Sequence, residues 1–537
     1  LNGDRNWAVG IRGFGDQFSK SVLVLIDGRS VYTPLFAGVL WTINNVMIED
    51  VDRIEVIRGP GGTIWGANAE NGVINIITKS SADTHGSLVV LGGGNVDQGT
   101  TSLRYGGGNG KGFNYRVYGT GFIRGPEFHA DNINYDNSRL GQVGFRTDWE
   151  HQSSTFTLQG DTYRGEFGDA QLLSTFSPPA SFISFASMDA YGGNLLGRWR
   201  KTLSEGSDLY LQAFWAHDFR IGSNFGETRD TFDVDFLHRF LLPVRQQFTY
   251  GFEARISPST YKEVLPTDDF EPHDKTSSIY SVFLQDEFTL VPDTLSLTLG
   301  SKLEHNNYTG FEYQPNGRLL WTPSKKQSFW TAITRAVRIP SRIDEDPDVS
   351  VVLPGPPEIV AEVIGSHALD SERLISYEAG YRSLINPALY FDISLFYNDY
   401  NNIVAQTGPV ISVAPTPAPP HVLALFQFQN GIRGFTKGFE IAPDWKPAPW
   451  WDLKTGYSYL HLSLSHLPGI IDTTTLPVLQ GSSPAHEVFV HSEFDIAKRF
   501  EFDPMYRYVS ALPAQNVRAY QTADLRLAWN LKHLALS

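Results

Sequence analysis

Two glutamates, Glu378 and Glu440, carry the clearest chemical signal in the sequence. Each lies between two apolar neighbours in a segment of alternating polarity. Because side chains alternate between the two faces of a β-strand, each carboxylate points to the face opposite its apolar neighbours. A carboxylate on an enclosed face needs a cation, and arginine can pair with it in a bidentate manner. The alternative is that both glutamates are separate surface charges screened by water.

Other residues that could do chemistry form no catalytic or cofactor-binding pattern. The chain has no cysteine, which removes thiolate nucleophiles and cysteine-ligated zinc. Thr267–Asp274 and Asp344–Asp348 could offer carboxylates to a divalent ion, but neither has calcium-loop spacing, and solvated loop charge is the simpler interpretation. Gly59–Gly66 lacks the lysine of a phosphate-binding loop, so its glycines are interpreted as turn residues. We expect no enzyme activity, no bound metal and no cofactor.

The elements that hold these residues are predicted to be β-strands. Of the 537 residues, 13% are aromatic, 49 are glycine and only 19% are charged, which favours strands over helices. From about Gly86 the chain falls into segments of about ten residues with alternating polarity, such as Phe248–Ile256 and Leu295–Glu304. The net charge of −15 argues against nucleic acid as a partner.

The lengths of the connections distinguish a membrane barrel from a soluble β-sandwich. Long connections, such as Ser257–Lys275, Val337–Asp370 and Asn401–Gln429, alternate with short ones, such as Leu241–Arg245 and Val291–Asp293. A transmembrane β-barrel has this pattern because its long loops lie outside the cell and its short turns lie in the periplasm. We count about 21 strands, so a 22-stranded antiparallel barrel is the nearest closed solution. No stretch reaches the roughly 18 apolar residues of a transmembrane helix.

Residues 1–82 have a different pattern from the rest of the chain. Three short apolar segments, Val22–Ile26, Ile54–Ile57 and Val73–Ile77, predict strands of a small α+β unit, and Asn71-Gly72 predicts a hairpin turn. A barrel of this size has a lumen wide enough to need a plug. We therefore predict a plug domain at residues 1–82 and an all-β transmembrane barrel at residues 83–537.

Four segments of the predicted plug, Ile11–Gly13, Leu25–Arg29, Glu49–Pro60 and Asn71–Ile76, form an ordered set of motifs. This set resembles the plug domain of TonB-dependent outer-membrane receptors, and Tyr377–Arg382 resembles one of the family's barrel strands. The motif residues implied by the resemblance are Asp27, Gly28, Arg29, Asp52, Arg53, Glu55, Gly59, Pro60, Asn71 and Gly72.

The resemblance also implies roles for four charged residues. In the family, arginines of two plug motifs and glutamates of two barrel strands form a cluster that holds the plug to the barrel wall. Arg12, Arg58, Glu378 and Glu440 match these positions. We call these four residues the plug–barrel lock.

The function implied by the resemblance is that of an energy-coupled receptor in the outer membrane of a Gram-negative bacterium, among lipid and lipopolysaccharide. A scarce, large ligand, most commonly a ferric siderophore, would bind at residues that the sequence does not reveal. The TonB complex would pull on a TonB box upstream of Leu1, and the chain is expected to lack part of the plug and the closing strand. Two alternatives are a passive, substrate-selective porin and a soluble or surface β-rich binding protein or hydrolase.

Overall fold

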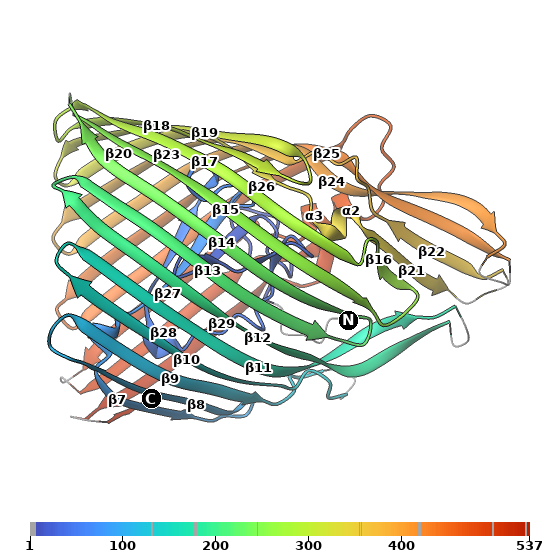
Figure 1. Ribbon diagram of the computed structural model, residues 1–537, viewed down its shortest axis with the longest axis horizontal. Helices are drawn as coiled ribbons and strands as arrows, with labels where there is room; N and C mark the ends of the chain where they lie inside the picture. Colours follow the sequence, from blue (N-terminus) through green and yellow to red (C-terminus); the bar gives the residue numbers. More distant parts are fainter. Residues whose placement is uncertain are drawn as a thin grey trace.

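The computed structural model describes residues 7–129, 133–176, 180–243, 245–353, 355, 357–416, 420–496, 499–531 and 534–537. Within these residues the chain forms a closed antiparallel β-barrel around a small N-terminal domain (Figure 1). Twenty-one strands of the described residues make the wall. They are β7 (Gly86–Gly92), β8 (Asp97–Gly108), β9 (Phe113–Arg124), β10 (Ser138–His151), β11 (Ser154–Ser174), β12 (Ser181–Ser204), β13 (Ser207–Ile221), β14 (Phe225–Leu242), β15 (Gln246–Glu263), β17 (Asp274–Val291), β18 (Leu295–Asn306), β19 (Gly310–Ser324), β20 (Gln327–Arg338), β23 (Glu372–Asn386), β24 (Leu389–Ala414), β25 (His421–Ala448), β26 (Trp451–His466), β27 (His486–Ile496), β28 (Phe500–Val509), β29 (Tyr520–Asn530) and β30 (Ala535–Leu536).

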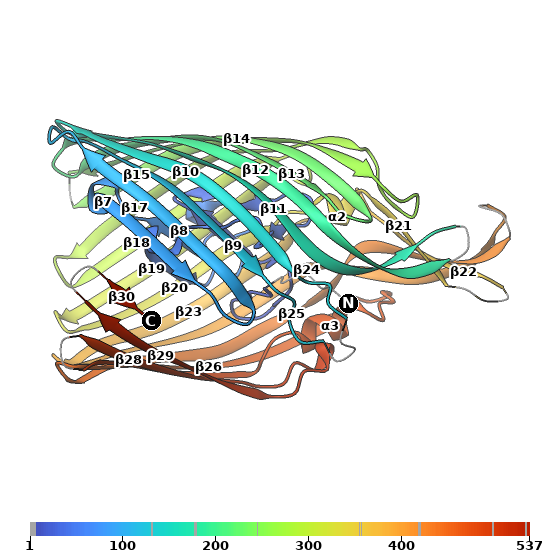
Figure 2. The same cartoon turned by 90° about the horizontal axis from the view of Figure 1, so that it is seen from below.

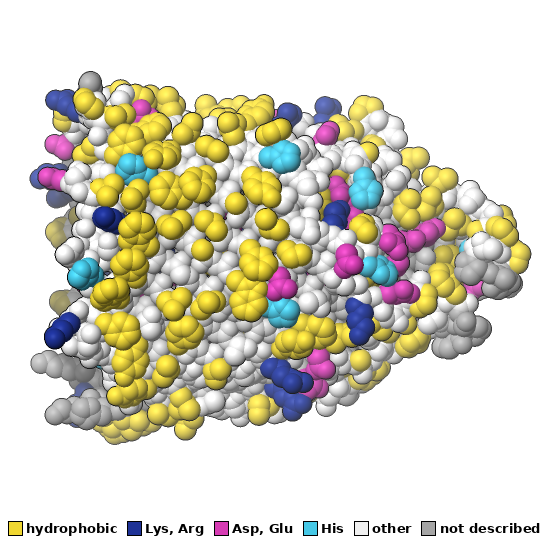
Figure 3. All heavy atoms as spheres, in the orientation of Figure 1, with side chains coloured by type: hydrophobic (Ala, Val, Ile, Leu, Met, Phe, Trp, Pro, Cys, Tyr) yellow, Lys and Arg dark blue, Asp and Glu magenta, His cyan; other side chains and the backbone are white. Residues whose placement is uncertain are grey.

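Strand β18 shows how the wall separates two environments. Leu299 and Leu303 are 47% and 55% exposed on the outer surface, whereas Lys302 and Glu304 are 4% and 2% exposed and face the lumen. This alternation is the pattern expected of a membrane-spanning strand. Figure 3 shows apolar side chains spread over the left and middle of one face, with most of its acidic side chains toward the right, where the long connections lie. The fold is therefore the all-β membrane barrel that the sequence predicts.

Several strands extend far past the membrane. β24 and β25 have 26 and 28 residues, against the roughly 9–11 that cross a bilayer. The prediction of a loop over Asn401–Gln429 is therefore wrong, because β24 and β25 occupy most of this segment. Two other predicted loops also contain strands, namely β16 (Asp268–Phe270), β21 (Pro347–Leu353) and β22 (Ile359–Ile364). Outside the membrane the outer face of a strand no longer meets lipid, so regular apolar alternation does not mark these segments as strands.

The domain inside the barrel is built on a four-stranded sheet with the order β2-β1-β6-β5. Its strands are β1 (Val22–Ile26), β2 (Arg29–Ser30), β5 (Val51–Arg58) and β6 (Gly72–Thr78), and a separate pair joins β3 (Tyr32–Thr33) to β4 (Gly38–Val39). All five residues of β1 are buried. The three strands predicted in this region are confirmed, and Figures 1 and 2 show the domain within the lumen.

The plug has a hairpin turn at Asp27-Gly28, but it has none at Asn71-Gly72, where the sequence predicts one. Asp27 and Gly28 connect Ile26 to Arg29 and have φ values of 51° and 78°, which makes a type I′ turn between β1 and β2. Asn71-Gly72 is not a hairpin turn, and that prediction is wrong. Gly72 is the first residue of β6 and pairs with Arg58, so the connection from β5 to β6 runs over residues 59–71.

Short helices complete the described chain. They are α1 (Gly62–Trp65), α2 (Arg342–Glu345), α3 (Thr475–Gly481), η1 (Ile48–Asp50), η2 (Ser81–Thr84) and η3 (Pro513–Gln515). No helix among the described residues is long and apolar enough to cross a membrane. Helix α2 lies on the plug, because the Arg342 and Ile343 amides donate to the carbonyls of Pro34 and Leu35 at 3.0 and 2.9 Å.

Candidate functional site

Arg12 of the plug lies between two glutamates of the barrel wall. Its Nη1 is 2.6 Å from Glu378 Oε1, and its Nε is 3.2 Å from Glu440 Oε1. Glu378 belongs to β23 and Glu440 to β25, so one guanidinium joins the plug to two wall strands. The Arg12 guanidinium also lies over the Phe396 ring, 4.3 Å from its centroid. All three charged side chains are 2–8% exposed, which shields the ion pairs from water.

Arg58 and Gly59 complete the lock. Arg58 Nη1 is 3.1 Å from Glu440 Oε2, although its side chain is 42% exposed. Gly59 has a φ of 102°, and a Cβ there would lie 2.4 Å from Glu378 Oε1 and 3.0 Å from Arg12 Nη1. A side chain at position 59 would therefore displace the glutamate. The structure brings together all four residues that the sequence predicts for the lock.

The charge of Arg12 follows from its surroundings. Burial lowers the pKa of Arg12, but the charges of Glu440 and Glu378 and their hydrogen bonds raise it further, so the net change is upward. The guanidinium therefore stays protonated at any physiological pH. Separating it from both carboxylates would leave a buried, unpaired charge, which is the costly state of such a cluster.

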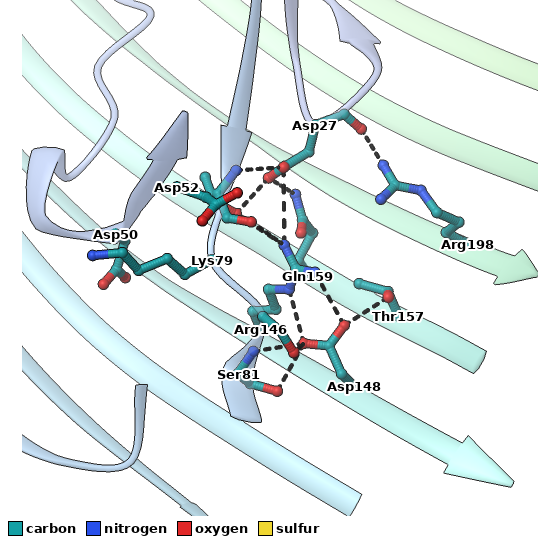
Figure 4. A network of polar contacts seen from close by, with 12 residues as sticks. Asp27, Asp50, Asp52, Lys79, Ser81, Arg146, Asp148, Thr157, Gln159 and Arg198 are labelled. Carbon is teal, nitrogen blue, oxygen red and sulfur yellow. Dashed lines mark hydrogen bonds and ion pairs between the residues drawn. The ribbon is translucent and has the colours of Figure 1, made fainter. Parts of the chain in front are cut away.

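A second group of plug–wall contacts surrounds Asp27 (Figure 4). The Asp27 carboxylate accepts from the Thr78 amide at 2.8 Å, the Thr78 hydroxyl at 2.7 Å and Gln159 Nε2 at 2.9 Å. Arg198 of β12 donates to the Asp27 carbonyl. The turn residue identified in the sequence motif thus joins two plug strands to β11 and β12.

Asp148 extends these contacts to the segment that links the plug to β7. Its carboxylate accepts from the Ser81 amide and hydroxyl, both at 2.8 Å, and from Arg146 Nε at 2.9 Å (Figure 4). Arg146 also donates to the Thr78 hydroxyl at 2.9 Å. The charged side chains here come from inward positions of β10, so the linking segment is fixed to the wall.

Asp50 makes a third set of buried contacts close to the second. It pairs with Arg104 of β8, and its Oδ2 is 3.1 Å from Arg116 Nε of β9. Arg116 also donates to the Lys79 carbonyl at 2.5 Å. Sequence reasoning missed Arg104, Arg116, Arg146 and Asp148. The signal that could have found them is a run of charged residues at inward positions of three successive strands.

The other motif residues take no part in the ion pairs of the lock. Arg53 pairs with Asp52 at 2.6 Å and Glu55 at 2.7 Å on the exposed strand β5. Arg29 lies in β2, and Pro60 follows Gly59 in the connection to α1. Asn71 Oδ1 accepts from the Tyr400 hydroxyl of β24 at 2.7 Å, a further plug–wall contact. A Cβ at Gly72 would lie 2.6 Å from Ile11 Cδ1 and from the Ile57 carbonyl oxygen, so close packing explains that glycine.

A chamber of about 970 Å³ lies between the plug and the wall strands β10–β15, β17 and β18. Leu23, Leu25 and Trp65 are among the plug residues that line it, and eight basic and five acidic side chains line the whole chamber. It reaches residues 204–207, in the short connection between β12 and β13.

The acidic connections contain two groups of possible metal ligands. Glu263, Asp269 and His273 form one, and Glu345, Asp346 and His367 form the other. Lys275 Nζ already lies 2.9 Å from Glu345 and 2.8 Å from Asp346, which satisfies the second group by ion pairing. His273 lies 2.8 Å from Asp269, and the pKa of His273 is raised, chiefly by this hydrogen bond and despite slight desolvation. We therefore interpret both groups as contacts between loop residues.

Family models match nearly the whole chain. The model of the TonB-dependent receptor plug domain matches residues 2–73, and the model described as TonB dependent receptor-like, beta-barrel, matches residues 83–537. The chain is 24% identical over 510 residues to the ferric enterobactin receptor of Pseudomonas aeruginosa, with 81% of this chain and 67% of that protein covered. It is 43% identical over 91 residues to the vitamin B12 transporter BtuB of Vibrio vulnificus, which covers 17% of this chain and 14% of the transporter.

Solved structures show the same fold. The siderophore receptor PirA from Acinetobacter baumannii matches with a TM-score of 0.75 at 16% identity, over 97% of this chain and 85% of that one. A ferric enterobactin receptor mutant from Pseudomonas aeruginosa, in complex with enterobactin, matches with a TM-score of 0.76 at 16% identity, over 99% and 87%. The protein is an outer-membrane β-barrel of Gram-negative bacteria. It belongs to the family of TonB-dependent receptors.

Proposed function

We propose that the protein is an energy-coupled receptor that imports a ferric siderophore through a plug-gated barrel, and that it has no enzymatic activity. The observation that carries this proposal is the contact between Arg12 and the two wall glutamates, Glu378 and Glu440. A lumen whose plug is held by buried ion pairs is closed at rest. Import then needs a step that releases the plug, which a passive porin does not have.

These contacts support a proposed role for each part of the chain. Residues 1–82 act as the plug, and residues 83–537 act as the barrel. The plug–barrel lock, Arg12, Arg58, Glu378 and Glu440, holds the closed state. The TonB complex pulls on a TonB box upstream of the described residues, and outer-membrane lipid and lipopolysaccharide surround the barrel. The siderophore assignment is supported by the names of the relatives, among which are ferric enterobactin receptors.

Uptake in living cells tests this function. The full-length protein is expressed in a strain without its own siderophore receptors, and accumulation of iron from radiolabelled ferric enterobactin is measured beside cobalamin uptake. We expect ferric enterobactin uptake that stops on loss of TonB or on addition of a protonophore, while surface binding persists. Uptake that survives both treatments would identify a passive porin. Uptake of cobalamin without uptake of ferric enterobactin would mean that the imported ligand is not a siderophore.

A further inference from the structure

The chamber between the plug and β10–β18 is more positive than the protein around it. Eight basic side chains and five acidic ones line it, whereas the whole chain has a net charge of −15. Its volume of about 970 Å³ is in the usual range for small-molecule pockets, about 300–1,000 Å³. A cleft lined by an excess of one sign of charge concentrates ions of the other sign. The chamber therefore favours anions.

Several of the basic side chains are neutralised by neighbours and supply no free charge. Arg255 Nε lies 2.8 Å from Asp233, Lys302 Nζ lies 2.7 Å from Glu253, and Arg239 Nη2 lies 2.5 Å from Asp208. These pairs account for much of the lining on β13–β15 and β18. The excess of positive charge must therefore come from lining residues outside these pairs.

That excess is concentrated at Arg198 and Arg200 of β12. The two residues are separated by one position, so they share the inward face with roughly 7 Å between them along the strand. Within the described part of the chain, neither guanidinium has a carboxylate at ion-pair distance. Arg198 donates to Gln212 Oε1 at 2.9 and 2.7 Å and to the Asp27 carbonyl, all of them uncharged acceptors. Arg200 lies over the Tyr210 ring, 5.5 Å from its centroid.

These contacts position the two guanidiniums without neutralising them. The Tyr210 hydroxyl donates to Gln212 Oε1 at 2.8 Å, so the residue that holds Arg198 also holds the ring beneath Arg200. Two fixed like charges side by side on β12 repel each other, and an anion bound between them would relieve that repulsion. Guanidinium groups suit carboxylate and phenolate oxygens because they offer paired donors in one plane.

One acidic side chain opposes the two arginines. Asp235 of β14 lies opposite Gln212 in the strand register and lines the same chamber. Of the five lining carboxylates in the described chain, it is the one without a basic group at ion-pair distance. Removing its charge should make the chamber more attractive to anions, which is the opposite of removing Arg200.

We infer that Arg198 and Arg200 form a transit site for the anionic part of the imported metal chelate, between the plug and β12. This inference rests on the proposed import function. The site lies near residues 204–207, in a short connection of the kind that faces the periplasm, so it would receive the ligand after the plug moves. On the transport path the ligand reaches the chamber after it has left the extracellular surface. The site binds the anion only in passing, before the ligand moves on to the periplasm.

A substituted cysteine measures the charge of the chamber without any transport. The 537 residues contain no cysteine, so a single Thr155→Cys substitution gives one thiol among them. Thr155 lines the chamber and lies opposite Arg200 in the register. Purified full-length protein is treated with methanethiosulfonates that carry either a sulfonate or a trimethylammonium group. We expect the anionic reagent to be favoured about tenfold or more over its preference at a Ser324→Cys control, at the exposed end of β19.

The variants then assign this preference to particular residues. Arg200→Gln should reduce it several-fold, Arg198→Gln with Arg200→Gln should abolish it, and Asp235→Asn should increase it. Arg382→Gln is the matched control, because Arg382 lies on β23 and pairs with Asp392 at 3.0 Å. An anion preference that Arg200→Gln leaves unchanged would overturn the inference. A thiol at position 155 that reacts with neither reagent would also overturn it, because another part of the full-length protein would then fill the chamber.

Uptake by the same variants separates the transit site from the proposed function. With ferric enterobactin as the probe, Arg200→Gln should lower the maximal rate of uptake by about tenfold and leave surface binding unchanged. Maximal uptake equal to that of the Arg382→Gln control would count against the transit site while leaving the proposed function intact. Absence of uptake by the unmodified protein would refute the proposed function, whereas the thiol measurement would still report the charge of the chamber.

Discussion

Arg12 and Glu440 are 428 positions apart in the chain, yet the Arg12 Nε and the Glu440 Oε1 are 3.2 Å apart. The Ser394 hydroxyl donates to the other oxygen of Glu440 at 2.8 Å, which fixes the carboxylate toward the plug. One glutamate thus receives the arginines of both plug motifs, since Arg58 also lies 3.1 Å from it. The lock depends on Glu440 more than on any other wall residue.

Glu440→Gln should loosen the plug without opening a cavity, because glutamine has nearly the same volume as glutamate. Arg12 would keep Glu378 but lose its second partner, and breaking a buried ion pair costs about 3–5 kcal/mol. Hydrogen exchange of the plug strands β1 and β6 measures the change, and their protection should fall. The control is Asp392→Asn, which breaks the more exposed Arg382–Asp392 pair and should cost about 0–1 kcal/mol. Equal protection in the two variants would mean that the lock does not hold the plug.

Gly59→Ala should weaken the same lock from the plug side. The new Cβ would lie 2.4 Å from Glu378 Oε1, and a φ of 102° is strained for alanine. We expect a loss of plug protection of about 1–3 kcal/mol from strain alone, plus the loss of the Arg12–Glu378 contact. Gly28→Ala separates the two effects, because Gly28 is also a plug residue with a positive φ of 78°, and its Cβ would meet no atom closer than 3.3 Å. A loss no larger than that of Gly28→Ala would show that contact with Glu378 adds nothing.

Asp27→Asn tests whether the second group of contacts acts independently of the lock. The substitution removes the charge that accepts from Thr78 and Gln159, and hydrogen bonds to charged groups contribute about 1.5–3 kcal/mol. The lock lies on β23–β25 and Asp27 lies against β11 and β12, on distant parts of the wall. Effects at distant sites add to within about 0.5 kcal/mol. The double variant with Glu440→Gln should therefore show the sum of the two losses in plug protection, whereas a smaller combined loss would mean that the plug is released as one unit.

The sequence predicts a strand reliably where the two faces of that strand lie in different environments. Leu303 and Lys302 are neighbours in the chain, yet one faces the membrane and the other the lumen, so alternation reveals the strand. The outer part of β24, near Val413, has no such contrast because water surrounds both faces, so the sequence there predicts a loop instead of a strand. The prediction of a hairpin turn at Asn71-Gly72 was wrong for a different reason. The Asn-Gly pair has the residue types of a turn, but Gly72 packs against Ile11 and is the first residue of β6.

The site could be predicted only in part. Alternation predicts that Glu378 and Glu440 point inward, but the resemblance to the family is what identifies all four lock residues. Arg146 and Asp148 also occupy inward positions, but nothing in the sequence reveals which plug segment they meet. That contact depends on how the plug is oriented in the lumen, which packing in three dimensions determines.

Glu70 predicts how the plug responds to pH. It is a buried plug residue, 2% exposed, near Glu372, Arg338 and Tyr400 of the wall. Burial, together with the charge of Glu372 and against the charge of Arg338, raises the pKa of Glu70 to about 8 from an ordinary value of 4.5. Between these two values the folded plug holds a proton that the unfolded chain has released. Plug stability should therefore fall as the pH rises through this window, and level off above it, by at most about 1.4 kcal/mol per pH unit.

The measurement is hydrogen exchange of the plug strands at several pH values between 5 and 9, corrected for the intrinsic exchange rate. Glu70→Gln should remove the slope, because glutamine is neutral throughout and close in shape to the protonated acid. Glu55→Gln is a suitable control, since Glu55 is a partly exposed residue of the same domain and should leave the slope in place. A slope that persists in Glu70→Gln would mean that another group of the plug–wall interface takes up the proton.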